Sequence, residues 1–235
     1  MRHLTIPLLL FLPLLHGCRN LDCVEAPGPA VSRELTLEAI KGVITEGSID
    51  VEVVQGPVQQ VRAEGPAAAM DLLNTRVKDG IWHVRTDRCF DGDVDLVVHI
   101  TLPALERVGV AGSGDVRATG NFAGDRLEVT VAGSGDITMP LSARELEVSI
   151  LGSGDVNLSG TAGQARVRIT GSGAVNGLEL SAGRAKVEIM GSGDAGLTVV
   201  DALEAEILGS GGVNYRGTPK VSTSISGSGA VVPVP

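Results

Sequence analysis

Apolar and polar residues alternate along the second half of the chain, and the pattern repeats with a nearly constant period. Two residues before each copy of a Gly-Ser-Gly triplet the chain has Val or Ile, and four residues before it Val, Ala or Thr. Because successive side chains of a strand point to opposite faces, this spacing predicts a strand with one buried face. Apolar residues resume two positions after the second glycine, so each triplet is predicted to form a corner between two strands. The triplets begin at Gly112, Gly133, Gly152, Gly171, Gly191, Gly209 and Gly227.

Successive triplets are 18–21 residues apart, which indicates a repeat architecture. Segments such as Val156–Ser159 and Leu197–Val199 add a third short strand to each repeat, followed by a glycine near the next bend. Three short strands and three bends describe one coil of a parallel β-helix, in which equivalent residues of successive coils lie about 4.8 Å apart. The sequence therefore predicts an all-β solenoid over residues 106–235.

Glycine at these corners has a structural explanation. A sharp bend with positive φ tolerates glycine best, and the close approach of neighbouring coils disfavours a side chain. The serine between the glycines is expected to hydrogen-bond to nearby backbone groups. The predicted turn glycines are Gly112, Gly114, Gly133, Gly135, Gly152, Gly154, Gly171, Gly173, Gly191, Gly193, Gly209, Gly211, Gly227 and Gly229.

Residues 32–105 contain fewer glycines and several alternating segments, which predict strands, with a short helix in the PAAAMDLLNTRV segment. Residues 47–51, GSIDV, resemble a degenerate copy of the corner. This region is therefore expected to extend the same solenoid and to close its end, because an uncovered coil would present an open sheet edge.

The first residues have the layout of a secretory signal, with a basic Arg2 and an apolar run too short to span a membrane. The LHGC segment resembles a bacterial lipobox. We expect residues 1–17 to be removed, Cys18 to carry a lipid, and residues 18–31 to form a flexible tether. The alternative is an ordinary cleaved signal that leaves Cys18 free to pair.

Composition restricts the partners. Aromatic residues make up 2% of the chain, so its core must be built from aliphatic side chains. The formal net charge of −9 repels phosphate backbones, which argues against nucleic acid as a partner. Contact with a membrane is expected only through the lipid at Cys18.

If Cys18 is lipidated, two cysteines remain in an oxidising compartment. We predict a disulfide between Cys23 and Cys89, the alternative being two unpaired buried thiols.

An aspartate follows several corners, at Asp115, Asp136, Asp155 and Asp194, but Ala174, Gly212 and Ala230 stand in the other copies. Aspartate beside a turn commonly accepts backbone hydrogen bonds, and this is the expected role. The alternative is a weak cation site, because a row of carboxylates can recruit a metal such as calcium.

The sequence shows little sign of catalysis. One GxGxxG match, at residues 191–196, precedes another strand rather than the helix that dinucleotide binding needs. After the signal the histidines are His83 and His99, both in predicted strands away from the repeat corners, and no cofactor is expected. Polysaccharide-degrading β-helices build clefts from long loops, for which the even triplet spacing leaves no room.

Several segments together resemble a known bacterial family. The repeated GSGDV corners, GSIDVEVVQG, VKDGIWHV, the lead-in DVDLVVHITLPALERVGVAGSGDV and the closing YRGTPKVSTSISGSGAV are similar to the putative auto-transporter adhesin head GIN domain, a family of unknown function. The resemblance covers residues 32–231 and implies a right-handed β-helix, extracytoplasmic placement and paired cysteines like Cys23 and Cys89.

These observations favour a lipid-anchored, non-enzymatic envelope domain that binds a surface glycan or a protein. The alternatives are a structural or self-associating envelope protein and a carbohydrate-active enzyme. Arg19 directly after Cys18 is not the aspartate that retains lipoproteins at the inner membrane, so the outer membrane is the expected location.

Overall fold

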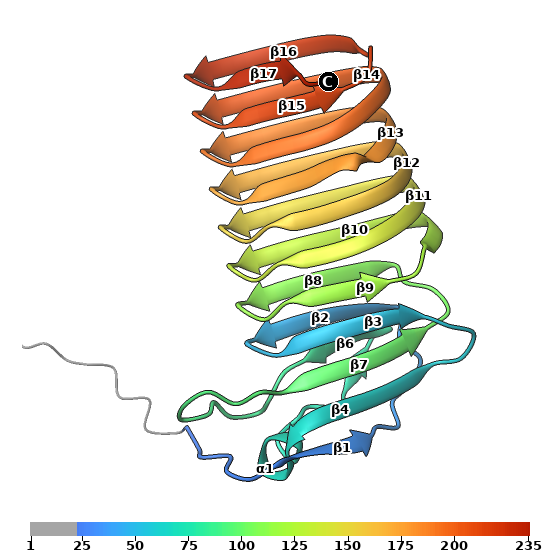
Figure 1. Ribbon diagram of the computed structural model, residues 1–235, viewed down its shortest axis with the longest axis vertical. Helices are drawn as coiled ribbons and strands as arrows, with labels where there is room; N and C mark the ends of the chain where they lie inside the picture. The colour runs from blue at the N-terminus through green and yellow to red at the C-terminus, as the bar shows by residue number, and fades with distance from the viewer. Residues whose placement is uncertain (1–22) are drawn as a thin grey trace, which may run out of the picture.

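The computed structural model describes residues 23–235, which form one elongated stack of β-strands with a single short helix, α1 (Ala67–Met70) (Figure 1). Within the described residues, no helix combines the length and apolar character that crossing a membrane requires. The strands are β1 (Ala30–Glu34), β2 (Gly42–Gly47), β3 (Asp50–Gln55), β4 (Gln60–Pro66), β5 (Val77–Lys78), β6 (Ile81–Val84), β7 (Val97–Leu102), β8 (Arg107–Gly112), β9 (Val116–Thr119), β10 (Phe122–Gly133), β11 (Ile137–Gly152), β12 (Val156–Gly171), β13 (Ala174–Gly191), β14 (Asp194–Gly209), β15 (Gly212–Arg216), β16 (Lys220–Gly227) and β17 (Ala230–Pro233).

The repeat forms the predicted parallel β-solenoid, with about 7 turns. Each coil pairs in parallel with the next, and equivalent positions of the repeat lie side by side, as where Gly133 pairs with Gly152 and Gly152 with Gly171. The sequence period is therefore the length of one coil.

The coils differ in one detail from the expectation of three separate short strands. From β11 to β14 each coil is one continuous strand of 16 or 18 residues that runs from one triplet to the next. In β12 the alternation of buried and exposed residues breaks near Gly160 and again near Gln164. The pairing with the neighbouring coil resumes after each bend, although Gly160 has φ +108° and Gly163 is unpaired.

The core is a set of aliphatic columns inside the stack. The residue two positions before each triplet is buried in every coil but the last, and the apolar residue after the corner is buried similarly. The first of these columns contains Val110, Val131, Ile150, Ile169, Ile189 and Ile207. Stacking like on like explains why a chain with few aromatic residues can fill its interior.

The N-terminal segment joins the same stack, as the GSIDV sequence predicted, but out of chain order. Strand β2 lies between β6 and β8, and β3 lies between β7 and β9. Gly47 pairs with Gly112, and Val51 with Val116. The coil formed by β2 and β3 is thus inserted between two coils that follow it in the sequence.

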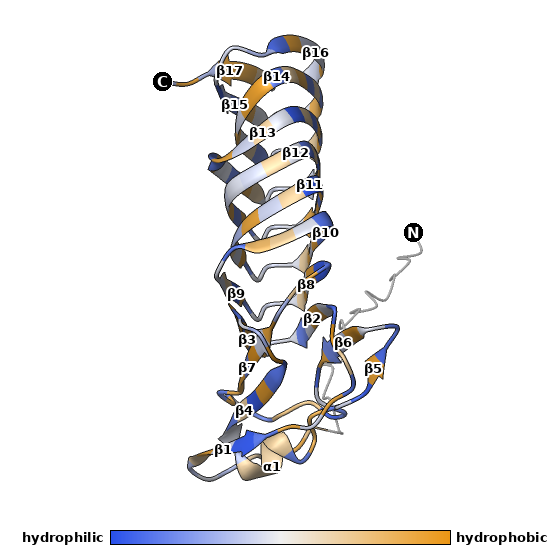
Figure 2. Ribbon diagram, turned by 90° about the vertical axis from the view of Figure 1, so that its right-hand side faces the viewer, coloured by the Kyte–Doolittle hydropathy of each residue, from blue (hydrophilic) through white to orange (hydrophobic). Residues whose placement is uncertain are grey.

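Antiparallel strands close the end below this coil. Strand β4 pairs antiparallel with β7, and β1 pairs antiparallel with β4 (Figure 1). The β5–β6 hairpin projects from the side of the rod near this end (Figure 2). Trp82 is fully buried in β6 and donates a hydrogen bond from Nε1 to the carbonyl of Asn74 at 2.9 Å, so it is a packing residue.

The expected flexible tether is held in place from Cys23 onward. Cys23 and Cys89 form a disulfide, with Cα atoms 4.5 Å apart. The amide of Val24 donates to the carbonyl of Cys89 at 2.9 Å, and the carbonyl of Val24 accepts from Asp91 at 3.0 Å. The prediction of a flexible tether over residues 18–31 is therefore wrong for its second part, which is attached to the domain at Cys23, at Val24 and, through β1, at Ala30. Its first residues, like the predicted lipid site at Cys18 and the signal over residues 1–17, lie outside the described residues.

Candidate functional site

The Gly-Ser-Gly corners are joined to one another through backbone amides. In each repeat the serine and second-glycine amides both donate to the carbonyl of the first glycine one coil below; Ser134 and Gly135, for example, reach the Gly112 oxygen at 2.9 and 3.2 Å. The serine hydroxyls do not make this joint, and they line an exposed edge of the rod. The corner is a backbone structure, which explains why glycine recurs there.

The two glycines are needed for different reasons. The first adopts positive φ, +141° at Gly133. The second does not, but a Cβ on Gly135 would lie 2.1 Å from the carbonyl oxygen of Gly114 in the coil below. A side chain there would force the coils apart.

The aspartates form a ladder of side-chain to backbone hydrogen bonds between coils. Each carboxylate accepts from the amide at the equivalent position of the next coil. The acceptor and donor pairs are Asp50 with Asp115 at 2.8 Å, Asp115 with Asp136 at 2.9 Å, Asp136 with Asp155 at 2.7 Å, Asp155 with Ala174 at 2.8 Å and Asp194 with Gly212 at 2.8 Å.

The gaps in the ladder show how the amides are satisfied without it. Above Ala174 the amide of Asp194 donates to the carbonyl of Gly173, and above Gly212 the amide of Ala230 donates to that of Gly211, both at 3.3 Å. The carboxylate therefore replaces a longer backbone bond with a shorter, charge-assisted one. The four aspartates predicted to have turn roles, Asp115, Asp136, Asp155 and Asp194, each accept such a backbone hydrogen bond.

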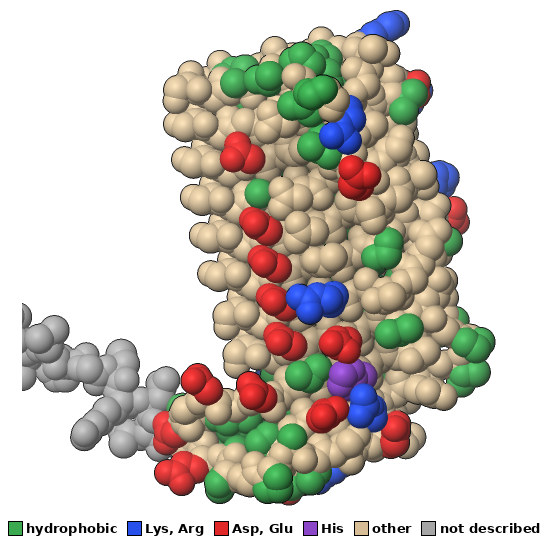
Figure 3. All heavy atoms as spheres, viewed as in Figure 1, with side chains coloured by type: hydrophobic (Ala, Val, Ile, Leu, Met, Phe, Trp, Pro, Cys, Tyr) green, Lys and Arg blue, Asp and Glu red, His purple; other side chains and the backbone are tan. Residues whose placement is uncertain are grey.

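A flat polar face extends beside this row, over the strand segments that follow the corners. Asn176 donates to the side-chain oxygen of Asn157 at 3.0 Å, and Asn157 approaches the hydroxyl of Thr138 at 3.4 Å. In Figure 3 this face is mostly uncharged, with acidic side chains in a vertical row along one side. We did not single out the amide ladder from sequence, although the repeat alignment places these three residues two positions beyond the aspartate column.

The strand segments that precede the corners carry a charged face. Arg107 bonds to Glu128, Arg126 to Glu147 at 2.7 Å, and Arg168 to Glu188 at 2.7 Å, each across one coil spacing. The hydrogen bond from Arg168 holds the pKa of the Glu188 carboxyl below its ordinary value of 4.5, with further help from Lys186. These pairs join adjacent coils along the rod.

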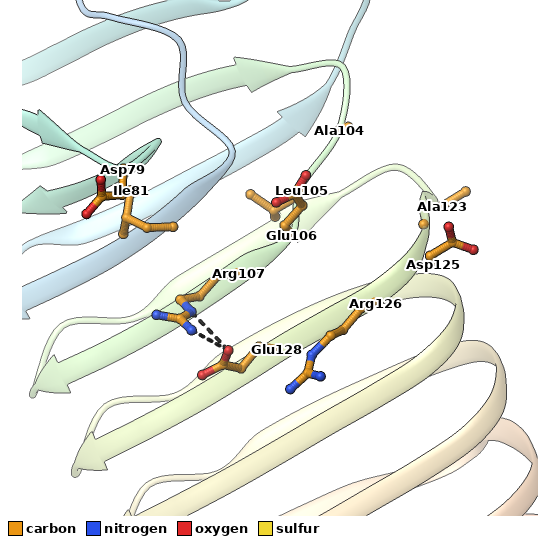
Figure 4. Close-up of a pocket in the computed structure, with 11 residues that line it drawn as sticks. Asp79, Ile81, Ala104, Leu105, Glu106, Arg107, Ala123, Asp125, Arg126 and Glu128 are labelled. Carbon is orange, nitrogen blue, oxygen red and sulfur yellow. Dashed lines mark hydrogen bonds and ion pairs between the residues drawn. The ribbon is translucent and has the colours of Figure 1, made fainter.

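A groove of about 620 Å³ lies on the charged face where the β5–β6 hairpin approaches β8 and β10 (Figure 4). Leu105 and Ile81 supply apolar surface, and Asp79, Glu106 and Asp125 add carboxylates. Sequence reasoning missed this groove because the hairpin comes from the capping region and only the tertiary fold brings it beside the repeat. Arg107, Arg126 and Glu128 also line the groove, and Arg107 is paired with Glu128, so the lining carries charges of both signs.

The histidines are held by carboxylates, away from the repeat corners above them. His83 Nδ1 lies 2.7 Å from Glu46, and His99 Nδ1 lies 2.9 Å from Glu52. Residues 191–196, the GxGxxG match, form a corner and the start of β14, with no helix after them.

The fold and these surfaces define a class: a capped parallel β-solenoid whose repeats are joined through glycine corners. The chain belongs to the family described as putative auto-transporter adhesin, head GIN domain, whose model matches residues 40–219. No curated protein matches it in sequence.

Solved structures share the fold. A putative adhesin from Bacteroides fragilis NCTC 9343 superposes with a TM-score of 0.82 at 24% identity, covering 89% of this chain and 99% of that one. A protein from Parabacteroides distasonis ATCC 8503, described as a putative lipid binding protein, has a TM-score of 0.76 at 23% identity, covering 91% and 100%. A putative adhesin from Parabacteroides merdae ATCC 43184 has a TM-score of 0.72 at 22% identity, with the same coverages.

Proposed function

We propose that this protein is a lipid-anchored, non-enzymatic interaction domain of the bacterial cell envelope that presents the flat polar face of its solenoid to a surface glycan or protein. Membership of an adhesin-like family supports placement at the cell surface or in the envelope. The lipobox-like LHGC sequence supports anchoring through Cys18, and Arg19 after it favours the outer membrane.

The observation that carries the binding proposal is the row of amides and hydroxyls formed by Thr138, Asn157 and Asn176. Their side chains repeat at the inter-coil spacing of about 4.8 Å. After the hydrogen bonds between them, each Asn side chain retains a further N–H and a further lone pair for a partner. Such a row suits an extended partner with regularly spaced hydroxyl or amide groups, because each coil contributes one equivalent contact. Affinity would come from many weak contacts acting together.

Membrane fractionation tests the anchor. The wild-type protein is expected in the outer-membrane fraction, and Cys18→Ala in the soluble periplasmic or secreted fraction. Recovery of both proteins in the same soluble fraction would refute lipid anchoring.

Binding of purified protein to bacterial and host glycan arrays, and adhesion of cells with and without the gene, test the function. Asn157→Arg with Asn176→Arg is expected to reduce binding, whereas Arg166→Asn with Arg184→Asn, on the charged face, is the matched control. Equal binding by both variants would contradict use of the polar face, and normal adhesion of deletion cells together with no ligand would contradict the adhesin role.

A further inference from the structure

The coil at the end opposite the cap leaves core positions open. Val221 and Ile225 in β16 are 41% and 43% exposed, although they continue the inward columns of the solenoid. One coil below, Leu203 and Ile207 occupy the same columns and are each 1% exposed. Another layer of strand would therefore bury apolar surface here, as it does in every coil below.

The outer edge of β16 is also open for pairing. Strand β16 pairs with β14 on one side, and no described strand lies on its other side. Its neighbour β17 contains Pro233, which cannot donate to a ladder, but β16 has no proline. The edge strand at the capped end, β1, contains Arg33 and Glu34, whereas β16 has no acidic residue in a chain of net charge −9.

The sequence of β16 is nearly the same read in either direction. Residues 221–225 are VSTSI, with Thr223 at the centre. We propose that β16 pairs antiparallel with β16 of a second copy about a two-fold axis at Thr223, so that two solenoids stack end to end. In a two-fold interface residue i of one copy meets residue j of the other and j meets i, so a strand that reads nearly the same in both directions opposes similar residues along its length.

Every opposed pair in this register is compatible. Val221 faces Ile225 of the second copy across the two open cores, Ser222 faces Ser224, and Thr223 faces itself. Apolar pairs and threonine pairs stabilise antiparallel strands. The one charged residue of β16, Lys220, faces Ser226 and does not meet its own equivalent.

The acidic character of the chain does not oppose this contact. Two glutamates, Glu204 and Glu206, lie one coil below Ser222 and Ser224. Three strand spacings, about 14 Å, would separate them from those of the second copy. That distance exceeds the Debye length of about 8 Å at physiological salt, so their repulsion is largely screened.

Disulfide trapping in the full-length chain tests the register. Thr223→Cys is expected to give a disulfide-linked dimer under mild oxidation in cells and after purification, since the two thiols meet at the axis. Val221→Cys alone and Ile225→Cys alone are expected to remain monomeric, whereas the double variant cross-links because the two positions face each other. Ser192→Cys, at an exposed corner below, is the control for random collision.

A second experiment, with added charge, tests whether the disulfide-linked dimer depends on pairing of the two β16 strands rather than on random collision of thiols. Ser222→Lys with Ser224→Lys places lysines opposite lysines between copies, while Glu204 and Glu206 of the same chain offset their charge, so the fold is retained. This change is expected to abolish both the Thr223→Cys dimer and concentration-dependent sedimentation. Ser159→Lys with Thr170→Lys adds the same charge to β12 and is expected to leave both unchanged.

The outcomes decide the proposal. The proposal would be overturned if Thr223→Cys gave no disulfide-linked dimer, or if this dimer formed no faster than that of Ser192→Cys. It would also be overturned if the Thr223→Cys dimer still formed in the presence of Ser222→Lys and Ser224→Lys. So would a strict monomer in sedimentation from about 5 to about 500 µM, the range expected for an interface at the small end of the size distribution. None of these measurements involves a glycan or the lipid, so their failure leaves the proposed function intact.

Discussion

Gly154→Ala should be strongly destabilising even though its backbone does not require glycine. No positive φ occurs at Gly154, so alanine suits its conformation. The added Cβ would lie 2.2 Å from the carbonyl oxygen of Gly135 and 3.0 Å from a methyl carbon of Val131 in the coil below. The clash is with backbone, which cannot rotate away as a side chain can.

The loss of stability can be estimated from the contacts that change when the corner moves to accommodate the added methyl group. Moving the corner outward by about 1 Å weakens the amide bonds from Ser153 and Gly154 to the Gly133 oxygen, now 2.9 and 3.2 Å, each contributing about 1 kcal/mol. Overpacking of the adjacent core adds about 1–3 kcal/mol. We expect a total of about 3 kcal/mol, or a fall in Tm of about 6–12 °C for a domain of this size.

Urea and thermal unfolding followed by circular dichroism measure this cost, and hydrogen exchange locates it. Because repeat proteins can unfold in segments, faster exchange should appear first in residues 131–156. Gly124→Ala is the matched control, since its Cβ would meet only the carbonyl of Arg126, at 3.9 Å. Equal midpoints for the two variants would refute contact between coils as the reason for glycine.

Three further changes probe the ladder, the cross-link and the charged face. Asp155→Ala should cost about 1 kcal/mol in urea unfolding, because the amide of Ala174 loses its carboxylate acceptor; no change would contradict the ladder. Cys89→Ser should lower stability by about 2–4 kcal/mol, and a wild-type Tm insensitive to reductant would contradict this. The pKa of Glu188 is depressed in the folded state, so the ionised carboxylate stabilises the fold fully above pH 4.5, and this stabilisation is lost as the pH falls below that value. The Glu188→Gln variant should therefore show a weaker dependence of Tm on pH below 4.5. An unchanged dependence would contradict the pairing of Glu188 with Arg168.

The first coil provides a natural comparison for the corner. Ile49 stands where the later coils have their second glycine, and it is buried. Beneath it the chain passes from β6 to β7 through a loop, residues 85–96, rather than through another corner. Glycine is therefore required where one corner lies on another, which a single copy of the motif does not reveal.

The repeat made most of the solenoid predictable from sequence. Local alternation specified which side chains point inward, and the period specified which residues stack, so the two signals agreed at every coil. The aspartate column could be assigned to turn chemistry for the same reason, because Asp115, Asp136 and Asp155 occupy equivalent positions. The distances of their carboxylates to the next amide required the structure.

The sequence by itself determined the repeat region, in which residues that pair between neighbouring coils are separated by one repeat period along the chain. Tertiary structure alone decided the insertion of β2 and β3 between later coils, the backbone hydrogen bonds of Val24 with Cys89 and Asp91, and the groove beside the β5–β6 hairpin. Each joins segments whose separation follows no period, so no local pattern specifies the pairing. These segments pack where the folded solenoid has an unpaired strand edge or an uncovered surface, and such places exist only once the coils have stacked.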